Sequence, residues 1–140
     1  MNQVCRQHGS QLVINRGSFE SHRLNAFDDF RHRHLNSRLL NALRESPFAE
    51  DFVLSASCHD VEELRLARRL GCHYAILSTV RPTASHPGRQ AKGWFGFKRI
   101  AGKAGLPVYA LGGVQRRDLV AARYQGAIGV AGITDFWSLS

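Results

Sequence analysis

Along most of this chain, short apolar runs alternate with longer stretches in which apolar residues recur every three or four positions. The runs predict buried strands, and the periodic stretches predict helices with one apolar face. The predicted strands are 12–14, 52–56, 74–78, 108–111 and 129–133, and the predicted helices are 4–8, 37–43, 61–70, 93–104 and 116–124. About five or six strands that alternate with helices indicate an α/β fold with a parallel sheet and right-handed crossovers. An open doubly wound sheet and part of a (β/α)₈ barrel both fit this order.

Polar residues and glycines at the predicted helix ends support these boundaries. Ser37 is placed to cap the helix at 37–43. Asp60 followed by Glu63 predicts a capping box, in which each side chain accepts a hydrogen bond from the backbone of the other residue. Gly71 ends the same helix. Ser57-Cys58-His59 is expected in the turn before this helix.

The segment from residue 17 to residue 35 gives a poor signal. Residues 31–35 (Arg-His-Arg-His-Leu) lie where the order of elements requires another strand, yet they are too polar for a buried one. Three histidines in this region, His22, His32 and His34, raise the question of a metal. No acidic residue is spaced to complete a site with them, so we predict no metal ligands here.

Length and composition indicate one globular domain that spans residues 1–140. A chain of 140 residues with 44% hydrophobic residues can bury a substantial core. No apolar run is long enough to cross a bilayer and no signal-peptide pattern precedes the first helix, so we expect a cytoplasmic protein without membrane contacts. The three cysteines are scattered, which favours reduced thiols over a disulfide or a zinc site.

The formal net charge of +8 raises the alternative of a nucleic-acid partner. The basic residues are dispersed over the predicted helices, where they stand beside acidic residues, and no aromatic residues interleave with them. This pattern is typical of solvated helix faces. We therefore expect no nucleic-acid partner, whereas small anionic ligands suit such a surface.

The stretch Tyr109 to Gly113 is the first candidate for chemistry. A buried strand runs into Gly112-Gly113, and a predicted helix follows. Glycines let backbone N–H groups approach an oxyanion closely, which is typical of a phosphate-binding loop. A second strand that runs into glycine follows at 129–133. The alternative, two ordinary turns that need glycine, stays open at this point.

Ligands of parallel α/β folds bind where the strands end. The predicted strand ends are rich in hydroxyls and glycines and poor in carboxylates, which argues against a pair of catalytic carboxylates. Cys58 and His59 are adjacent and point apart, so they form a weak nucleophile and base pair. Thr83, Ser85 and His86 share one loop and suit a phosphate, although an ordinary polar loop would have the same composition.

Residues 55–137 contain several short motifs in a specific order: Ser57-Cys58-His59, Leu70-Gly71-Cys72-His73-Tyr74, Thr83-Ala84-Ser85-His86-Pro87, Lys92-Gly93-Trp94, Tyr109-Ala110-Leu111-Gly112-Gly113 and Gly129-Val130-Ala131-Gly132-Ile133. In these motifs the chain resembles the thiamine-phosphate synthase family, including its TenI-like members. The Ser-Cys-His and Thr-x-Ser-His-Pro forms look most like the synthase-like domain that is fused to a MutT-type Nudix domain in some bacteria.

This resemblance implies a (β/α)₈ barrel that couples hydroxymethylpyrimidine diphosphate to thiazole phosphate, giving thiamine phosphate and pyrophosphate with Mg²⁺. Its small phosphorylated substrates would be held by two groups of residues. By resemblance, the catalytic and pyrophosphate-binding group is Ser57, Thr83, Ser85 and His86. The substrate- and phosphate-binding group is Asn15, Gly112, Gly113, Gly132, Ile133 and Thr134.

The chain also departs from the family pattern. It starts near the end of the second helix of the barrel, so we expect about six βα units, strands 3–8, in a partial barrel. The family's Gln-x-Arg-x-Lys strand has no counterpart, Arg16 replaces a magnesium aspartate, and Thr79 stands where TenI-like tautomerases have a histidine. Mg²⁺ is thus implied without evident ligands, and catalytic activity stays open. The alternative is a non-catalytic remnant or accessory module that binds phosphate ligands and forms an oligomer or pairs with another chain.

Overall fold

A computed structural model describes residues 2–11, 13–15, 31–45, 51–83, 88 and 90–132. Its centre is one sheet of six parallel strands that follow each other in chain order. The strands are β1 (Ile14–Asn15), β2 (His32–Leu35), β3 (Val53–Cys58), β4 (Tyr74–Leu77), β5 (Val108–Ala110) and β6 (Gly129–Val130). Within the described residues, β1 and β6 do not pair with each other, so the sheet is open there. The predicted α/β class and its order of elements are confirmed.

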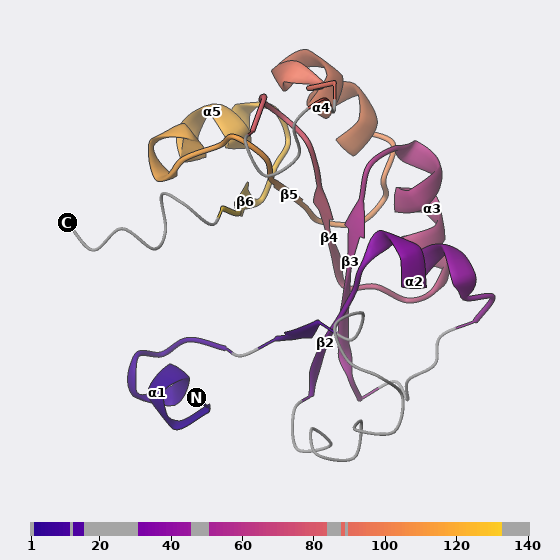
Figure 1. Ribbon diagram of the computed structural model, residues 1–140, viewed down its shortest axis with the longest axis vertical. Coiled ribbons are helices and arrows are strands. Elements are labelled where there is room, and N and C mark those ends of the chain that lie inside the picture. The colour runs from indigo at the N-terminus through magenta and orange to yellow at the C-terminus, as the bar shows by residue number, and fades with distance from the viewer. Residues whose placement is uncertain are drawn as a thin grey trace.

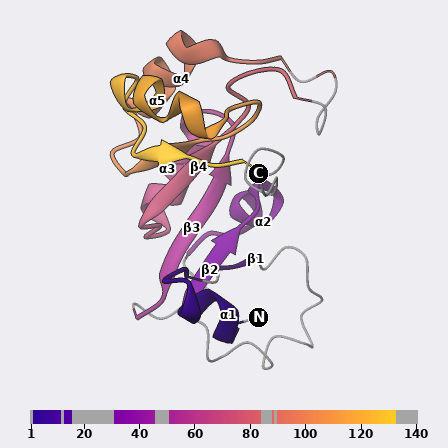
Figure 2. The same cartoon turned by 90° about the vertical axis from the view of Figure 1, so that its left-hand side faces the viewer.

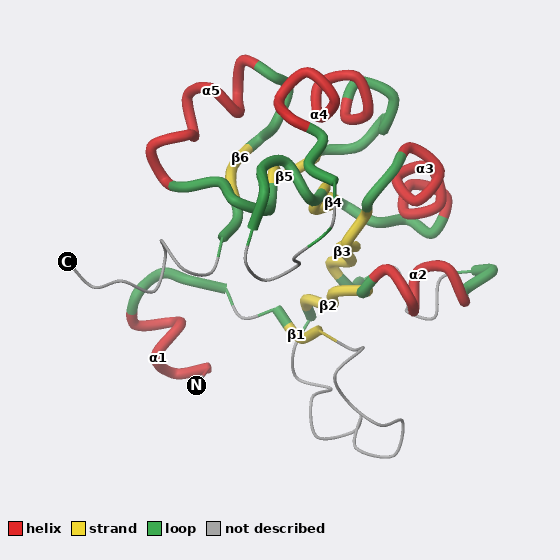
Figure 3. The backbone as a smooth tube through the Cα atoms, turned by 45° about the horizontal axis from the view of Figure 1, so that its top comes forward, coloured by secondary structure: helices red, strands yellow, loops and turns green. Residues whose placement is uncertain are grey.

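The helices are α1 (Asn2–Gln7), α2 (Ser37–Ala42), α3 (Val61–Arg69), α4 (Gly93–Ala101), the 3₁₀ helix η3 (Arg116–Asp118) and α5 (Leu119–Tyr124). Helices α2 to α5 lie along one side of the curved sheet, which we call the outer face (Figures 1 and 3). We call the opposite side the inner face, and within the described part of the chain α2 to α5 do not cover it (Figures 1 and 3). Figure 2 shows β2 and β3 running in the same direction, as their parallel pairing requires. In the described part of the chain, no helix is long and apolar enough to cross a membrane.

The core lies between the outer face and these helices. Alternate residues of β3 and β4 point into it, and Leu64 of α3 and Phe97 of α4 meet them from the helix side with fully buried side chains. The strand residues that point there are Leu54, Ala56, Cys58, Ala75 and Leu77. Each fully buried leucine or phenylalanine contributes about 1.5–3 kcal/mol of apolar burial. The apolar pattern of the sequence therefore identified this layer correctly.

Segment 31–35 corrects one prediction. It forms β2 between β1 and β3, with His34 paired to Ser55, where the order of elements required a strand, although its sequence was expected to be too polar for a buried one. Arg33 is 5% exposed, and its guanidinium lies 5.0 Å from the centroid of the Phe52 ring. A cation over an aromatic ring, on an aliphatic stem that packs, accounts for a basic residue in a buried position. The two histidines of β2 alternate with Arg33 and point to the inner face.

The helix caps also differ in detail from the prediction. Asn36, not Ser37, caps α2, because its side-chain oxygen accepts a hydrogen bond from Leu39 N at 2.8 Å. Asp60 caps α3 as predicted and accepts from Glu63 N at 2.8 Å. The Glu63 carboxylate, however, accepts from the backbone N–H of His59, one residue before the cap. Strand β3 extends to Cys58, so Ser57 and Cys58 belong to the strand rather than to the turn.

Candidate functional site

The inner face brings polar and aromatic side chains together. Side chains of a strand alternate between the two faces, and neighbouring parallel strands keep them in register. The inner-face residues set by this register are His32 and His34 of β2, Val53, Ser55 and Ser57 of β3, Tyr74 and Ile76 of β4, and Tyr109 of β5. The rings of Tyr74 and Tyr109 meet edge to face, with centroids 5.5 Å apart. Apart from Ser55, which is buried, these side chains keep part of their surface exposed.

His34 connects the two serines of β3. Its Nδ1 lies 2.9 Å from Ser55 Oγ, and its Nε2 lies 2.8 Å from Ser57 Oγ. The Ser55 hydroxyl donates to the carbonyl oxygen of Arg33 at 3.2 Å, so Ser55 Oγ is left to accept from His34 Nδ1–H. Burial lowers the pKa of His34. In the neutral form of the ring, this arrangement favours the hydrogen on Nδ1, and Nε2 then accepts a hydrogen bond from the Ser57 hydroxyl.

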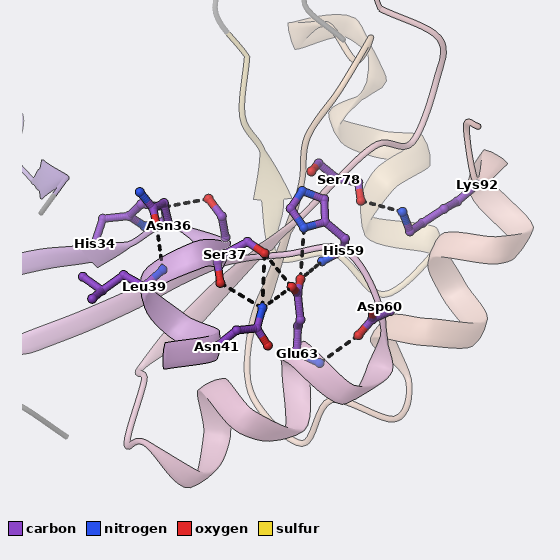
Figure 4. A network of polar contacts seen from close by, with 11 residues as sticks. His34, Asn36, Ser37, Leu39, Asn41, His59, Asp60, Glu63, Ser78 and Lys92 are labelled. Atoms are coloured by element: carbon purple, nitrogen blue, oxygen red, sulfur yellow. Dashed lines mark hydrogen bonds and ion pairs between the residues drawn. The ribbon is translucent and has the colours of Figure 1, made fainter. Parts of the chain in front are cut away.

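A second group, the Glu63 cluster, comprises Ser37, Asn41, His59 and Glu63 (Figure 4). The Glu63 carboxylate accepts from Ser37 Oγ at 2.5 Å, from Asn41 Nδ2 at 2.7 Å and from His59 N at 2.7 Å, and it lies 3.0 Å from His59 Nδ1. Burial acts to raise the pKa of Glu63, but the hydrogen bonds from Ser37, Asn41 and His59 outweigh it and hold the pKa below its ordinary value. An ionised Glu63 thus connects α2, the end of β3 and α3.

Gly112 and Gly113 lie against the loop that follows β4. Both have positive φ, +94° and +63°. A Cβ atom on Gly112 would lie 2.7 Å from Thr79 Cγ2, and one on Gly113 would lie 2.6 Å from the carbonyl oxygen of Pro82. Arg81 N also donates to Gly112 O at 2.9 Å. Close packing of two strand-end loops therefore requires glycine at both positions, which gives the ordinary-turn alternative a definite physical basis.

The same loop also keeps donors available. Among the described residues, the backbone N–H groups of Gly112 and Gly113 donate a hydrogen bond to no other group. Gly112 is partly exposed and Gly113 is exposed, so a ligand can reach this turn from solvent, and two consecutive free donors beside a strand end suit an external anion. The close packing and the free donors are compatible with each other, because the packing involves the Cα side and the carbonyl of this turn.

Two cations lie around the end of β4. Lys92 Nζ donates to Ser78 O at 2.6 Å, and Ser78 N in turn donates to Cys58 O at 3.0 Å at the end of β3. Arg81 forms an ion pair with Asp118 at 3.1 Å, and its guanidinium lies 5.7 Å from the centroid of the Trp94 ring. Sequence reasoning did not select Lys92 as a site residue. Its position directly before α4, where the chain returns from the β4 loop, was the available signal.

The structure places the predicted site residues unevenly. Ser57 lies on the inner face, and Gly112 and Gly113 lie together with residues 79–82 of the β4 loop, which leads directly to Thr83. Gly132 follows β6 by two residues, and Asn15 is the last residue of β1. Four predicted site residues lie outside the described residues: Ser85, His86, Ile133 and Thr134. His34 was considered only as a possible metal ligand, and its partnership with Ser57 was missed.

Two earlier questions concern Cys58 and a metal. Cys58 points to the outer face with a fully buried side chain, and burial raises the pKa of its thiol, which makes it a poor nucleophile. Within the described residues, no three His, Cys, Asp or Glu side chains are grouped so that they could hold a metal ion. That part of the chain gives no position for the Mg²⁺ that the resemblance implies, and no step below depends on it.

Comparisons with known proteins assign the chain to a family. The model of the family described as thiamine monophosphate synthase matches residues 1–136. A putative thiamine-phosphate synthase 2 of Aquifex aeolicus (strain VF5) is 35% identical over 86 residues, 61% of this chain and 46% of that protein. A thiamine-phosphate synthase of Prochlorococcus marinus (strain MIT 9303) is 28% identical over 129 residues, 91% of this chain and 35% of that protein. This chain thus matches less than half the length of either relative.

Solved structures agree in fold. A thiamine phosphate pyrophosphorylase from Pyrococcus furiosus superimposes with a TM-score of 0.70 at 19% identity, covering 94% of this chain and 61% of that one. FabK from Thermotoga maritima gives a TM-score of 0.57 at 18% identity, covering 74% of this chain and 33% of that one. At these identities the likeness shows the fold alone, a TIM-like α/β arrangement. Together with the family match over residues 1–136, it leads to one conclusion: the chain belongs to the thiamine monophosphate synthase family.

Proposed function

We propose that this chain binds phosphorylated thiazole and pyrimidine substrates at its strand ends and takes part in their coupling to thiamine phosphate and pyrophosphate. The observation that carries the proposal is the pair of free backbone N–H groups at Gly112 and Gly113, directly after a buried strand. Gly112, Gly113 and Gly132, with Ile133 and Thr134, would hold the thiazole phosphate. Ser57, Thr83, Ser85 and His86 would face the pyrophosphate of the second substrate, and Asn15 its pyrimidine side.

The chemistry of the inner face supports this assignment. Departure of pyrophosphate from a pyrimidine needs donors and positive charge that stabilise the leaving anion, and it needs no strong base. Lys92 and Arg81 provide positive charge near the end of β4, and Ser57 provides a hydroxyl on the neighbouring strand. Glu63, the carboxylate at the end of β3, is already engaged by three hydrogen-bond donors of the protein. These groups suit binding of an anion better than general acid–base catalysis by a carboxylate pair.

A second candidate is an accessory module that binds a phosphorylated ligand and pairs with another chain or a second copy. The observation that favours it is the open sheet, since in the described residues β1 and β6 each lie at an edge. Unpaired strand edges are sites where another strand can add. Binding without turnover, together with a stable oligomer, would favour this candidate over the enzyme.

Calorimetric titration with thiazole phosphate, then thiamine phosphate, with and without Mg²⁺, tests the proposal. We expect saturable binding by the wild-type chain and an affinity lower by about tenfold or more in Gly112→Ala. A Cβ there would lie 2.7 Å from Thr79 Cγ2 and displace the turn, so that its N–H no longer points to the anion, and the loss of one hydrogen bond to a charged group costs about 1.5–3 kcal/mol. Gly126→Ala is the matched control, since Gly126 has a φ of +87° but open space where a Cβ would lie. A folded wild-type chain that binds neither ligand would overturn the proposal. Turnover with the pyrimidine diphosphate then separates the enzyme from the binding module.

A further inference from the structure

The hydroxyl of Ser57 is committed to His34 in the free protein. One continuous chain of hydrogen bonds runs from the Ser57 hydroxyl to His34 Nε2, from His34 Nδ1–H to Ser55 Oγ, and from the Ser55 hydroxyl to Arg33 O. The carbonyl at its end can only accept, so it fixes the direction of every donor before it. Ser57 Oγ therefore presents only lone pairs to the inner face.

With its hydrogen directed to His34, the Ser57 hydroxyl is poorly oriented to bind an anion. An oxyanion of a phosphate group needs donors, and the lone pairs of a hydroxyl oxygen repel it. A second proton on His34 removes the conflict, because Nε2–H then donates to Ser57 Oγ. The Ser57 hydroxyl hydrogen is released by this change and can point to the anion, while the bonds at Ser55 and Arg33 stay as they are.

We propose that a pyrophosphate-type anion that binds beside Ser57 takes up one proton from solvent on His34, so that His34 is the residue that converts Ser57 into an anion donor. This inference rests on the proposed function, because it requires a phosphorylated ligand on the inner face. It assigns His34 as a positioning residue that acts through Ser57. No bond other than that of the transferred proton is made or broken.

The surroundings of His34 favour an uncharged ring until an anion arrives. The β3 side of the pair offers Ser55 and Ser57, which are neutral. On β2 itself, Arg33 points to the other face over Phe52, and His32 shares the inner face two residues away. Helix α2, which packs beside β2, has one charged residue, the exposed Arg38. On these described residues no carboxylate faces His34, and the bound anion would be its first negative neighbour.

The sign of the pH dependence follows from this linkage. Burial already holds the pKa of His34 in the free protein below its ordinary value, and a bound anion would raise it. The anion thus prefers the protonated protein, and its affinity increases as the pH falls from the pKa of the complex to that of the free protein. One linked proton gives a slope of about tenfold per pH unit at most. Below the lower of the two pKa values this contribution is constant.

Calorimetric titration with inorganic pyrophosphate near neutral pH, in two buffers with different heats of ionisation, measures the protons taken up. We expect the wild-type chain to take up more protons per pyrophosphate than His34→Gln, by up to one. Glutamine can keep both hydrogen bonds, yet it gains no proton. His32→Gln, on the same strand and face, should behave as the wild type. The titration of pyrophosphate itself is common to all three proteins and cancels in the comparison.

The outcomes separate this inference from the proposed function. Equal proton uptake in the wild type and in His34→Gln overturns the role of His34, whereas binding of thiazole phosphate near Gly112 still supports the function. Binding of thiazole phosphate without binding of pyrophosphate also overturns this inference alone. A folded chain that binds neither ligand overturns both.

A nitrogen–proton correlation spectrum of the His34 ring gives a test that needs no variant. We expect a neutral ring with its hydrogen on Nδ1 in the free protein and an imidazolium at saturation with pyrophosphate. A neutral ring with its hydrogen on Nε2 in the free protein, or a ring that stays neutral at saturation, would contradict the proposal.

Discussion

The two faces of the sheet are built from different kinds of residue. The outer face is apolar, covered by α2 to α5 and almost without exposed surface. The inner face carries histidines, serines and tyrosines, most of them half-buried. Residues one position apart on the same strand, such as Cys58 and Ser57, therefore belong to different environments. If the inner face binds a ligand as proposed, the comparison predicts that stability and binding can be altered separately along a single strand.

The outer face should give the largest loss of stability. Leu64→Ala removes a fully buried side chain between α3 and the sheet, and we expect the free energy of unfolding to fall by about 2–5 kcal/mol. Ile76→Ala is the inner-face counterpart, and its half-buried position predicts a smaller loss. Urea denaturation of both variants measures the difference. Equal losses would mean that the inner face is packed as closely as the outer one, which would break the distinction.

The Glu63 cluster lies where the outer layer meets the strand ends, and its effect should be intermediate. Glu63→Gln exchanges an ionised acceptor for a neutral amide, and we expect a loss of about 1–3 kcal/mol. Glu62→Gln is the control, because the side chain of Glu62 is 74% exposed and pairs with Arg65 on the same helix, whereas the side chain of Glu63 is 12% exposed. A surface pair of that kind contributes about 0–1 kcal/mol. Similar losses in the two variants would contradict the role of the cluster.

The pH dependence of Glu63 adds a signature. Its folded-state pKa is held below the ordinary value, so its contribution to stability is fully present above the pKa of the unfolded chain. It is lost as the pH falls through the folded-state pKa. Stability of the wild type should therefore decrease in mildly acidic solution more than that of Glu63→Gln. If the free energy of unfolding of the two proteins changed with pH in the same way, the hydrogen bonds to the Glu63 carboxylate would contribute nothing to stability.

The outer face could be predicted from the sequence because its signal is local. An apolar run such as 74–78 predicts a buried strand, and the spacing of Leu64 and Ala67 predicts which side of the helix is buried. Strand β2 was missed for a tertiary reason, since the aromatic partner of Arg33 lies outside the strand and its histidines face inward. Ser37 was predicted to cap α2, and the cap is Asn36 instead. Asparagine and serine both cap helices, so the sequence alone does not decide between two neighbours of these types, and the backbone geometry does.

The site itself depends on register, which the sequence does not contain. His34 and Ser57 are 23 residues apart, and Ser37 and Glu63 are 26 apart. Once β2 is paired with β3, alternation alone places His34, Ser55 and Ser57 on one face. The motif Ser57-Cys58-His59 drew attention to this strand end, but the hydrogen-bond partner of Ser57, His34, lies in the segment whose pattern was least informative.

The smallest loss of stability is expected for Ser57→Ala, at less than about 1 kcal/mol. Ser57 lies at the half-buried end of the hydrogen-bond chain, so water can replace its bond to His34 Nε2 from the inner face. Ser55→Ala is the matched comparison two residues earlier on the same strand and face. Ser55 is 1% exposed, and removal of its hydroxyl leaves both His34 Nδ1–H and Arg33 O without their partner, which predicts that the free energy of unfolding falls by about 1–3 kcal/mol.

Thermal unfolding and pyrophosphate titration of both variants measure this difference. Ser57→Ala should weaken binding of pyrophosphate by about tenfold, while it leaves the fold nearly as stable as the wild type. If Ser57→Ala were as destabilising as Ser55→Ala, the inner face would be closed to water at Ser57, and a ligand could not reach it there.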